Sequence, residues 1–544
     1  MKALAWRYAG GLIRAHPASF FVSLAAYVAY FTLVLAPGLI SRDIFDALSG
    51  HARVGLNLWT LIGLVAAAQL SRFGFQYVGG VVWNLFRYKG EALFKRNMMR
   101  WAMTARGPRV LPSSTGEAVS RFRDDTLQAV GLATMLIVSP QALTGAAAFA
   151  IMVAIDAPIA LLVVLPMVAT VVATYLLMRG IQRYRKALRE ATAEVTGFIG
   201  ETFGAVQAVK LAGAEARMAA RFERLGLARR SAAIRDLMLT TGLTAFSANM
   251  AVIAAGFVLL LAAQAMRVGR FTVGDFTLFV NYLALVSAAP SIVGQLLATE
   301  RQAKVSIDRM NAFAHGAAPM AMAARPRAGM TPPASALPRS DALKVFEARG
   351  LTCLHAGSGR GVRDIDLKVE RGRFLAVTGP VGSGKTTLVR ALLGLCGRDA
   401  GDVFWNGQAV ADPSLFFVPP RCAYTAQTPR LFSETLRENL LMGEPDDPAR
   451  LAAAIELAVF DEDVAAFDAG LETPVGARGV TLSGGQAQRA AAARMFVRAP
   501  DLLIFDDLSS ALDVATERKL WRRLFASGER TCIAVSHRRE ALGR

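Results

Sequence analysis

A glycine-rich segment that ends in lysine and threonine carries the most specific chemistry in this sequence. It reads Gly379-Pro380-Val381-Gly382-Ser383-Gly384-Lys385-Thr386-Thr387 and lies between a short apolar stretch, Phe374–Thr378, and an apolar helical pattern, Leu388–Leu395. In this strand–loop–helix context the glycines let backbone N–H groups surround phosphates, and the helix N-terminus adds positive potential. We expect Lys385 to reach the β- and γ-phosphates and the Thr386 hydroxyl to hold Mg²⁺. The segment therefore predicts a binding loop for the phosphates of ATP.

A second element of the same chemistry lies downstream, where an apolar stretch ends in two carboxylates. Leu502–Phe505 is followed by Asp506 and Asp507. A strand that delivers a carboxylate at its carboxyl end is the expected source of a further Mg²⁺ contact beside a phosphate loop. Many strands end in aspartate, so this assignment depends on the phosphate loop upstream. With that loop present, Asp506 is the predicted metal ligand.

Between and after these two elements, the sequence resembles the ATPase domain of ABC transporters. Leu482-Ser483-Gly484-Gly485-Gln486 is similar to the family's signature motif. Tyr424-Thr425-Ala426-Gln427 resembles the Q-loop, and Ser510-Ala511-Leu512-Asp513 resembles the D-loop. Ser536-His537, directly after the apolar stretch Thr531–Val535, resembles the segment that carries the family's switch histidine. The motifs also follow one another in the family's order.

The resemblance implies a nucleotide site that two chains share. From one side, ATP would be held by the phosphate loop together with Gln427, Asp506 and His537. From the other side, the signature residues Ser483, Gly484, Gly485 and Gln486 would contact the nucleotide of a partner chain, with the helix N-terminus near the γ-phosphate. The catalytic residues would be Asp507, His537 and Gln427, and the Mg²⁺ ligands would be Thr386, Gln427 and Asp506. The chain therefore needs a second half-transporter as its partner.

Three features depart from the family's pattern. The residue after the metal-binding aspartate is usually a glutamate that orients or activates water, and here it is Asp507. Aspartate is one methylene shorter, so we expect slower hydrolysis; such replacements occur in the weaker site of heterodimeric exporters, and both a homodimer and a heterodimer stay open. His355 stands where an aromatic residue usually stacks on adenine, and a surface histidine without a role is the alternative. The chain stops at Arg544, where the family usually continues with another strand and helix, so the domain is either truncated or closes unusually.

The N-terminal part of the chain carries long apolar stretches. Of the 544 residues, 53% are hydrophobic and 19% are charged, and the mean hydropathy is +0.37, which is typical of a membrane protein with a soluble part. A helix needs about 20 apolar residues to cross a bilayer. Six stretches meet this requirement: Ala18–Leu39, Leu56–Trp83, Val130–Ile155, Ile159–Met178, Leu239–Met266 and Phe276–Leu297. We therefore predict a six-helix transmembrane bundle followed by an α/β ATPase domain.

Basic residues gather in the connections that would lie on one side of the membrane. Lys2, Arg7 and Arg14 precede the first span, and the second and fourth connections are long and rich in arginine and lysine. The remaining connections are short and carry little charge. Under the positive-inside rule, the N-terminus, the two long connections and the C-terminal domain are cytoplasmic. We expect an integral protein of the lipid bilayer, specifically of the bacterial inner (plasma) membrane.

The two long cytoplasmic connections are long enough for helices to extend beyond the membrane and turn back. We predict turns near Ser113–Gly116 and Gly197–Gly204, with Thr115 as the cap of a helix through Glu117–Asp125. By the resemblance these turns would be coupling helices, and ordinary solvated loops are the alternative. A segment rich in Ala, Pro and Met predicts a linker. The predicted domains are thus residues 1–314 (transmembrane, with both coupling regions), 315–341 (linker) and 342–544 (ATP-binding).

The net charge and the cysteines indicate whether the chain binds nucleic acid, binds a metal or lies in an oxidising compartment. The formal net charge is +19, but the basic residues lie largely between apolar stretches, where membrane topology accounts for them, so we expect no nucleic-acid partner. Cys353, Cys396, Cys422 and Cys532 form no metal-binding pattern and are typical of a reducing compartment. An ATP-driven exporter of an unknown substrate is the predicted function. The alternative is an ATP-binding half that regulates, or hydrolyses weakly, within a heterodimeric transporter.

Overall fold

The chain forms two compact units. The computed structural model describes residues 3–50, 56–104, 115–314, 320–325, 341–355, 358–476, 481–508, 511–526 and 530–537. The first unit comprises Met1–Met99 and Ser114–Arg325, and the second comprises Arg100–Ser113 and Pro326–Arg544. The boundary after Arg325 falls inside the predicted linker, residues 315–341. Within the described residues, the first unit contains only helices and the second contains all the strands.

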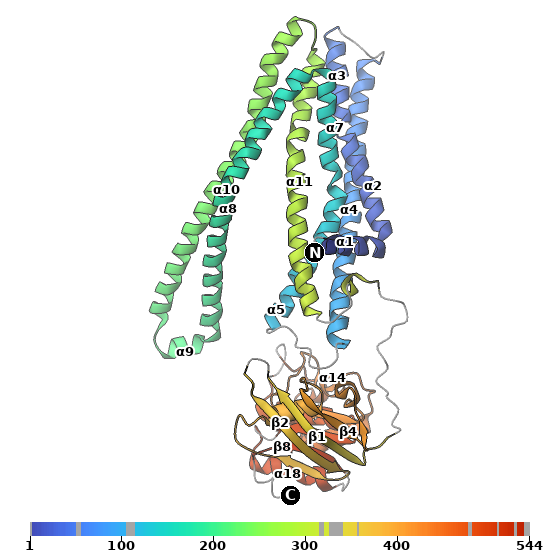
Figure 1. The fold of residues 1–544 in the computed structure, drawn as a ribbon, viewed down its shortest axis with the longest axis vertical. Coiled ribbons are helices and arrows are strands. Elements are labelled where there is room, and N and C mark those ends of the chain that lie inside the picture. Colours follow the sequence, from blue (N-terminus) through green and yellow to red (C-terminus); the bar gives the residue numbers. More distant parts are fainter. Residues whose placement is uncertain are drawn as a thin grey trace. The chain divides into compact units, whose positions relative to one another are not determined.

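The first unit begins with a short helix that runs across the long helices (Figure 1). This helix, α1 (Ala3–Ala15), is followed by α2 (Pro17–Leu33), α3 (Ala36–Leu48) and α4 (Leu58–Thr104). A proline lies in the first turn of both α2 and α3, where the missing N–H leaves no helical hydrogen bond unmade. α2 and α3 together form one apolar segment that is long enough to cross a bilayer. α4 alone is also long and apolar enough.

The next group of helices starts with α5 (Thr115–Ser120), the π-helical turn η1 (Arg121–Asp125) and α6 (Thr126–Val138). α7 (Pro140–Ile155) follows directly, with only Ser139, whose backbone is also helical, between the two. Asp156 then caps the long helix α8 (Ala157–Gly204), because its side chain accepts a hydrogen bond from the N–H of Ile159 at 3.1 Å. The last long helix is α11 (Val273–Phe313), and the 3-10 turn η2 (Ala321–Ala323) completes the unit.

Two of the long helices form a hairpin (Figure 1). α8 and α10 (Glu215–Arg267) run side by side and are joined through the short helix α9 (Val206–Leu211). The predicted turn at Gly197–Gly204 is therefore wrong, because α8 continues to Gly204. An exposed glycine costs a helix only about 1 kcal/mol, which a long helix packed along a partner tolerates. Of the other predicted turn, residues 113 and 114 lie outside the described residues, and Thr115 and Gly116 begin α5.

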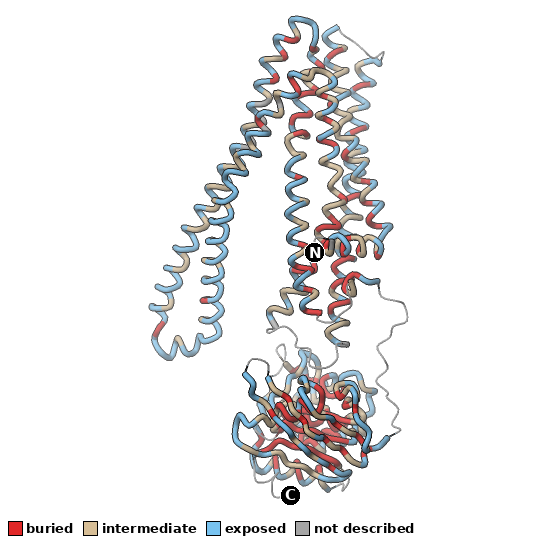
Figure 2. The backbone as a smooth tube through the Cα atoms, in the orientation of Figure 1, coloured by how far each residue is buried: buried red, intermediate tan, exposed pale blue. Residues whose placement is uncertain are grey.

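The hairpin is buried mainly at one end. Ile159 and Ala160 near the start of α8, and Val258 and Ala262 near the end of α10, pack into a buried cluster with α7 and α11. Much of the remaining hairpin surface is exposed (Figure 2), including large apolar side chains such as Met238, which is 72% exposed. Large exposed apolar surfaces of this kind mark contacts with lipid or with another protein.

Five helical segments are long and apolar enough to cross a membrane, by length and composition within the described residues. They are Pro17–Leu48, Leu58–Met103, Gly116–Ile155, Ala157–Gly204 and Val273–Phe313. Ala255–Arg267, inside α10, is a shorter apolar helix. The structure thus has the predicted class of a helical membrane unit followed by an α/β unit, while the sixth span does not meet this criterion.

The second unit is built on two four-stranded sheets. The antiparallel sheet has the order β2-β1-β4-β5 and consists of β1 (Val345–Leu354), β2 (Gly361–Glu370), β4 (Ala400–Trp405) and β5 (Gln408–Ala409). The parallel sheet has the order β3-β8-β7-β6 and consists of β3 (Phe374–Val377), β6 (Cys422–Thr425), β7 (Leu502–Asp506) and β8 (Thr531–Val535). Every residue of β7 and β8 is buried, as their continuous apolar sequences require.

Helices surround these sheets and form the core with them. They are α12 (Lys385–Leu392), α13 (Pro413–Phe416), α14 (Leu436–Leu441), α15 (Pro448–Leu457), α16 (Asp461–Ala466), η3 (Gly470–Glu472), α17 (Gly484–Phe496) and α18 (Val514–Ala526). Phe505 on β7 packs edge-on against Trp521 of α18, with ring centroids 5.7 Å apart. Figure 2 shows the buried residues of this unit gathered in its interior. This packed core holds the strand ends from which the candidate site is built.

Candidate nucleotide site

Four candidate segments follow or end the strands of the parallel sheet. β3 leads into the phosphate loop, β6 leads to Gln427, β7 ends at Asp506 and β8 leads to His537. The register aligns these strand ends, since Val377 and Asp506 both pair with Val535. Parallel strands present their carboxyl ends at one edge of the sheet, where ligands of such folds bind. The fold therefore brings to one edge residues that are far apart in the sequence.

The loop between β3 and α12 has a backbone conformation that favours glycine. Gly382 and Gly384, on either side of the exposed Ser383, have φ angles of 87° and 93°, in the left-handed region. Nζ of Lys385 donates hydrogen bonds to two carbonyl oxygens of the loop, including that of Gly379, each at 2.8 Å. The ammonium group thus lies over the loop, where phosphate oxygens would replace these carbonyls as its partners.

Thr386 and Asp506 meet between the start of α12 and the end of β7. Oγ1 of Thr386 donates to Oδ1 of Asp506 at 3.0 Å, and Asp506 is 1% exposed. The Tyr424 hydroxyl donates to the other carboxylate oxygen at 3.3 Å. Burial and the negative charge of Asp506 raise the pKa of the Tyr424 phenol, so it remains a donor.

This pair of oxygens fits Mg²⁺ bound together with a nucleotide. Mg²⁺ is usually held by one or two protein oxygens, with phosphates and waters completing an octahedron. A hydroxyl and a carboxylate oxygen 3.0 Å apart supply such a pair. Among the described residues, no group of three or more His, Cys, Asp or Glu side chains is placed to hold a metal without the phosphates.

Asp507 lies beside Gln427. Nε2 of Gln427 donates to Oδ2 of Asp507 at 3.2 Å. The structure thus joins the glutamine to the candidate base, and its predicted contact with Mg²⁺ stays a prediction. Asp507 has a φ of 58°, which aspartate tolerates better than most residues. Its N–H donates to the carbonyl oxygen of Val535 at 3.1 Å. The backbone of Asp507 is therefore held by β8, and its carboxylate accepts one side-chain hydrogen bond, from Gln427.

The two candidate histidines differ in their contacts. Nε2 of His355 lies 3.1 Å from Oγ1 of Thr387, within hydrogen-bonding distance. Thr387 is buried in the first turn of α12, so His355 lies beside the helix that follows the phosphate loop. His537 is exposed after β8 and makes no hydrogen bond to any residue that the structure describes. Among the described residues, the structure thus places His355, but not His537, within hydrogen-bonding distance of another candidate.

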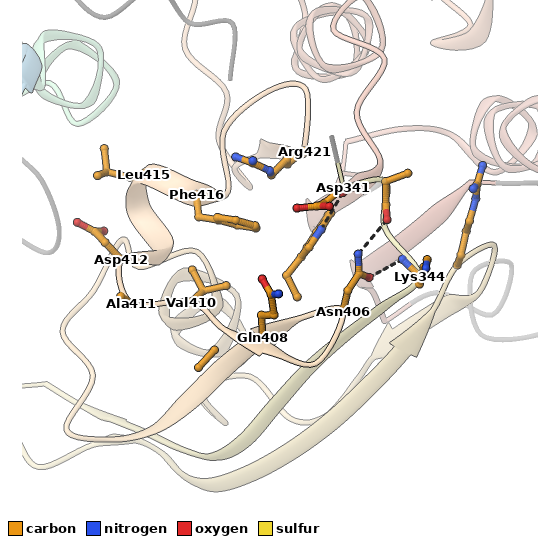
Figure 3. A pocket seen from close by; sticks show the side chains of 14 residues that line it. Asp341, Lys344, Asn406, Gln408, Val410, Ala411, Asp412, Leu415, Phe416 and Arg421 are labelled. Carbon is orange, nitrogen blue, oxygen red and sulfur yellow. Dashed lines mark hydrogen bonds between the residues drawn. The ribbon is translucent and has the colours of Figure 1, made fainter. Parts of the chain in front are cut away.

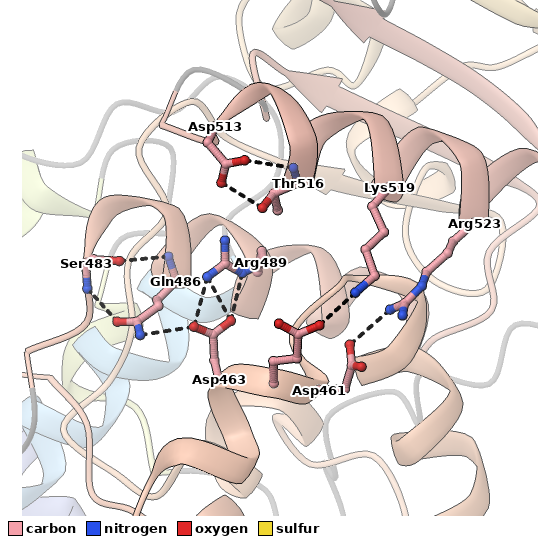
Figure 4. Close-up of polar contacts among 10 residues, drawn as sticks. Asp461, Asp463, Ser483, Gln486, Arg489, Asp513, Thr516, Lys519 and Arg523 are labelled. Atoms are coloured by element: carbon pink, nitrogen blue, oxygen red, sulfur yellow. Dashed lines mark hydrogen bonds and ion pairs between the residues drawn. The ribbon is translucent and has the colours of Figure 1, made fainter.

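The signature segment caps α17 and is anchored to α16 (Figure 4). Oγ of Ser483 accepts from the N–H of Gln486 at 3.2 Å, and Oε1 of Gln486 accepts from the N–H of Ser483 at 2.9 Å. Asp463 on α16 accepts from Nε and Nη2 of Arg489, both at 2.9 Å, and from Nε2 of Gln486 at 3.1 Å. Ser483 and Gly484 are exposed. The helix N-terminus is therefore rigidly held and open to an outside ligand.

The segment after Asp507 packs against the signature helix. A Cβ at Gly485 would lie 3.0 Å from the carbonyl oxygen of Ala511, so only glycine fits without a shift. The N–H of Ala511 donates to Oε1 of Gln488 at 3.1 Å. Ser510 lies outside the described residues. In the described chain, no hydrogen bond joins the signature residues to the phosphate loop, so the two candidate half-sites are separate.

A further cavity of about 750 Å³ in this unit is not part of the site (Figure 3). Its lining includes Lys344, Trp405, Phe416 and Arg421. Lys344 directly precedes β1, whereas His355 follows the last residue of that strand. The cavity therefore lies at the end of β1 remote from the phosphate loop, and no candidate site residue lines it.

Sequence reasoning assigned no role to two residues that shape the site. Tyr424 donates a hydrogen bond to the buried carboxylate of Asp506. Its position on the strand that leads to Gln427 could have indicated this role. Asp463 holds the signature helix through Arg489. Asp463 lies on α16 and Arg489 on α17, so no local pattern pointed to their pairing.

Two family models match this chain. The model described as the ABC transporter transmembrane region matches residues 17–289, which is just over half of the 544 residues. The model described as ABC transporter matches residues 362–510.

Individual proteins are also similar. The chain is 31% identical over 371 residues to the ATP-dependent lipid A-core flippase of Burkholderia orbicola (strain AU 1054), covering 67% of this chain and 60% of that protein. It is 28% identical over 552 residues to the Multidrug efflux ATP-binding/permease protein of Mycobacterium bovis (strain BCG / Pasteur 1173P2), covering 99% of this chain and 44% of that protein. The chain thus spans less than two thirds of the length of both relatives. A solved bacterial Atm1-family ABC exporter with ATP bound has the same fold, with a TM-score of 0.72 and 22% identity over 97% of this chain and 91% of that one.

Proposed function

Because this chain belongs to the ABC transporters, we propose that it is one half of an ATP-driven transporter that exports its substrate across the membrane. The observation that carries the proposal is the hydrogen bond from Thr386 to Asp506 beside the phosphate loop, in a chain that also has apolar helices long enough to span a bilayer. Relatives named as a flippase and a multidrug efflux protein support movement away from the cytoplasm.

Each residue of this half-site has a different proposed role in binding or hydrolysing ATP. Lys385 would neutralise phosphate charge, while Thr386 and Asp506 would hold Mg²⁺. When bound, Mg²⁺ supplies neutralisation of the charge that develops on the phosphates. Asp507 would orient the attacking water, and Gln427, which already donates to it, would keep that carboxylate in place. His537 and His355 complete the proposal, as the switch residue and the residue beside adenine.

The separation of the two half-sites supports a second half-transporter as the partner of this chain. Ser483, Gly484, Gly485 and Gln486 stand at an exposed helix N-terminus, which favours an anion. We assign this anion as the γ-phosphate of the nucleotide held by the partner. The exposed apolar side chains of the α8–α10 hairpin also need a covering surface, which the bilayer and the partner would supply.

The membrane unit would hold six spans, with α10 as the sixth. α10 runs beside α8 throughout the hairpin, and α8 is one of the five spans. A cavity of about 680 Å³ between α8, α10 and α11 has no charged residue in its lining, which includes Thr170, Tyr175, Met178 and Gln295. Such mixed apolar and hydroxyl surfaces suit a translocation path. The turn at α9 and the segment before α5 would be the coupling regions, on the cytoplasmic side of an inner membrane.

A weakly hydrolysing half of a heterodimer is the second candidate, and Asp507 motivates it. Its short carboxylate would make this site the slower of two, while an intact signature segment would serve a faster site on the partner. The two candidates share every structural feature described above. They differ in whether this chain alone hydrolyses ATP.

The test is transport by the full chain in inverted membrane vesicles, combined with ATPase assays after reconstitution. We expect vanadate-sensitive ATPase that Lys385→Ala abolishes and that Lys385→Arg does not restore, because arginine cannot reproduce the fit of the ammonium group in the loop. Lys304→Ala on α11 is a matched control, since that lysine lies outside the nucleotide site. ATPase that persists in Lys385→Ala would refute the proposal, and substrate accumulation without hydrolysable ATP would refute active export.

A further inference from the structure

A strongly cationic cavity lies in the membrane unit, far in sequence from the nucleotide site. Its volume is about 770 Å³, and it lies between α1 and the turn that contains η2. Among the described residues, its charged lining residues are Arg7, Arg14 and Arg325, and none is a carboxylate. None of the three arginines has an ion-pair partner among the residues that the structure describes.

One wall of this cavity is the polar face of α1. The opposite face of the helix is buried, with Tyr8 and Leu12 fully enclosed. Arg7 and Arg14 are seven residues apart, which is two helical turns or about 10.5 Å along the axis. They therefore lie on the same side of α1. A Cβ at Gly10, between them, would meet nothing within 4 Å, so this part of the helix surface is open.

The other wall is a turn that the rest of the unit holds in place. Nδ2 of Asn97, on α4, donates to the carbonyl oxygens of Met322 at 2.8 Å and Ala324 at 2.9 Å. A Cβ at Gly11 would lie 3.1 Å from Cε of Met320, so glycine allows the turn to approach α1 closely. These contacts fix the backbone directly before Arg325. The two walls of the cavity are thus fixed relative to each other, while Arg7, Arg14 and Arg325 are exposed to a ligand from outside.

The electrostatic field around the cavity is positive. His16, next to the end of α1, has its pKa lowered by burial and then by the positive charges of Lys89, Arg325 and Arg96. One carboxylate reaches a lining residue: Glu300 accepts a hydrogen bond from Nε1 of Trp6 at 3.0 Å. An anion that enters the cavity would therefore meet uncompensated guanidinium groups.

The cavity lies where the first apolar span begins. α1 ends at Ala15, and the span starts at Pro17. Trp6 lines the cavity and is 42% exposed, and tryptophan favours the headgroup region of a bilayer. Phe21, one turn into the span, is 57% exposed, so the start of the span offers apolar surface to acyl chains. The cationic cavity thus lies at the end of the chain segment that enters the membrane.

We propose that this cavity binds the phosphodiester headgroup of an anionic phospholipid from the leaflet at the N-terminal end of the first span. Guanidinium forks match phosphate oxygens in geometry as well as charge. Basic pockets at the membrane surface recognise such headgroups. A free anion would use only the cationic wall, whereas a phospholipid would also lay its acyl chains along the apolar span that begins at Pro17. The site is independent of ATP and would occupy the cytoplasmic leaflet in the proposed orientation.

The test is native mass spectrometry of the full chain titrated with dioleoyl phosphatidylglycerol and, separately, with dioleoyl phosphatidylcholine. Near an anionic lipid each arginine contributes about 1 kcal/mol, or about fivefold in affinity. We expect the wild type to prefer phosphatidylglycerol and the triple variant R7Q/R14Q/R325Q to lose this preference. The matched control is R224Q/R229Q/R230Q, which removes three exposed arginines of α10 and should keep it.

Two results would overturn the proposal. One is an unchanged preference in R7Q/R14Q/R325Q, and the other is an equal loss in the α10 control, which would show a general effect of charge. Glycerol 1-phosphate at millimolar concentration should not displace the lipid, and full displacement would make the site one for a soluble phosphate. If the triple variant does not purify as a folded species, the single variants R7Q and R14Q are used, each with an expected loss of about fivefold.

Discussion

Replacing Asp507 by glutamate tests whether a short carboxylate limits hydrolysis. The Asp507 backbone is fixed by its hydrogen bond to the carbonyl of Val535 at 3.1 Å, so an added methylene extends the carboxylate outward by up to about 1.5 Å. A displacement of about 1 Å at a reacting centre costs on the order of 100-fold in rate. We therefore expect Asp507→Glu to raise kcat by roughly 10- to 100-fold, which lowers the barrier by about 1.4–2.7 kcal/mol.

The same substitution should reduce stability, because of the backbone at this position. Asp507 has a φ of 58°, and the left-handed region costs ordinary residues about 1–2 kcal/mol but suits aspartate better. We expect the free energy of unfolding of Asp507→Glu to fall by up to about 1 kcal/mol. A faster but slightly less stable protein is therefore the expected outcome, and the two effects are measured separately.

The assay is ATP turnover by the reconstituted chain at saturating Mg²⁺-ATP, with nucleotide affinity measured independently. Asp507→Asn is the matched control, since it keeps the size of the side chain and its contact with Gln427 but removes the charge; its rate should fall below that of the wild type. If Asp507→Glu binds ATP normally and is no faster than the wild type, the length of the carboxylate is not limiting. If Asp507→Asn is also unchanged, Asp507 takes no part in hydrolysis.

Three further predictions follow from contacts outside the reacting centre. Arg489→Ala removes the two guanidinium hydrogen bonds to Asp463 and should lower the free energy of unfolding by about 1–3 kcal/mol. ATPase activity should fall while ATP binding is retained, and Arg489→Lys should recover part of the lost stability. Burial raises the pKa values of the Cys396 and Cys532 thiols to about 12, so iodoacetamide should label them only after unfolding. The free energy of unfolding in denaturant should decline as pH rises above about 8.5, the pKa of a thiol in an unfolded chain. Asn97→Ala leaves carbonyls of the η2 turn without a donor and should destabilise the membrane unit by about 1–3 kcal/mol, followed by thermal unfolding in detergent.

The positions of three candidate segments, namely the phosphate loop, Asp506 and His537, were predictable because each follows or ends a continuous apolar strand. A buried parallel strand has a recognisable sequence, and its carboxyl end is where polar residues of a site begin. The meeting of Thr386 with Asp506 is a direct consequence of two such strands lying in one sheet. The roles of the individual residues at these ends, including Asp507, stay predictions.

Other features depend on contacts that no local pattern contains. The turn between α8 and α10 lies beyond Gly204 and not at the predicted glycines, because helix–helix packing outweighs the modest cost of glycine in a helix. The ion pair of Asp463 with Arg489 joins two helices, and the turn pinned by Asn97 joins segments that are over two hundred residues apart. Such long-range partners are set by tertiary packing, which a single sequence does not reveal.

Asp507 and the signature segment together distinguish the two kinds of dimer. In a homodimer, each nucleotide would lie between Asp507 of one copy and Ser483 of the other, so that both sites share the short carboxylate. Either Asp507→Asn or Ser483→Arg would then stop turnover at both sites. In a heterodimer, Asp507 would act only in the site of this chain, whereas Ser483 would act only in the site of the partner. There, Asp507→Asn would leave most turnover intact while Ser483→Arg would remove it, so unequal losses in ATPase assays of the native assembly would exclude a homodimer.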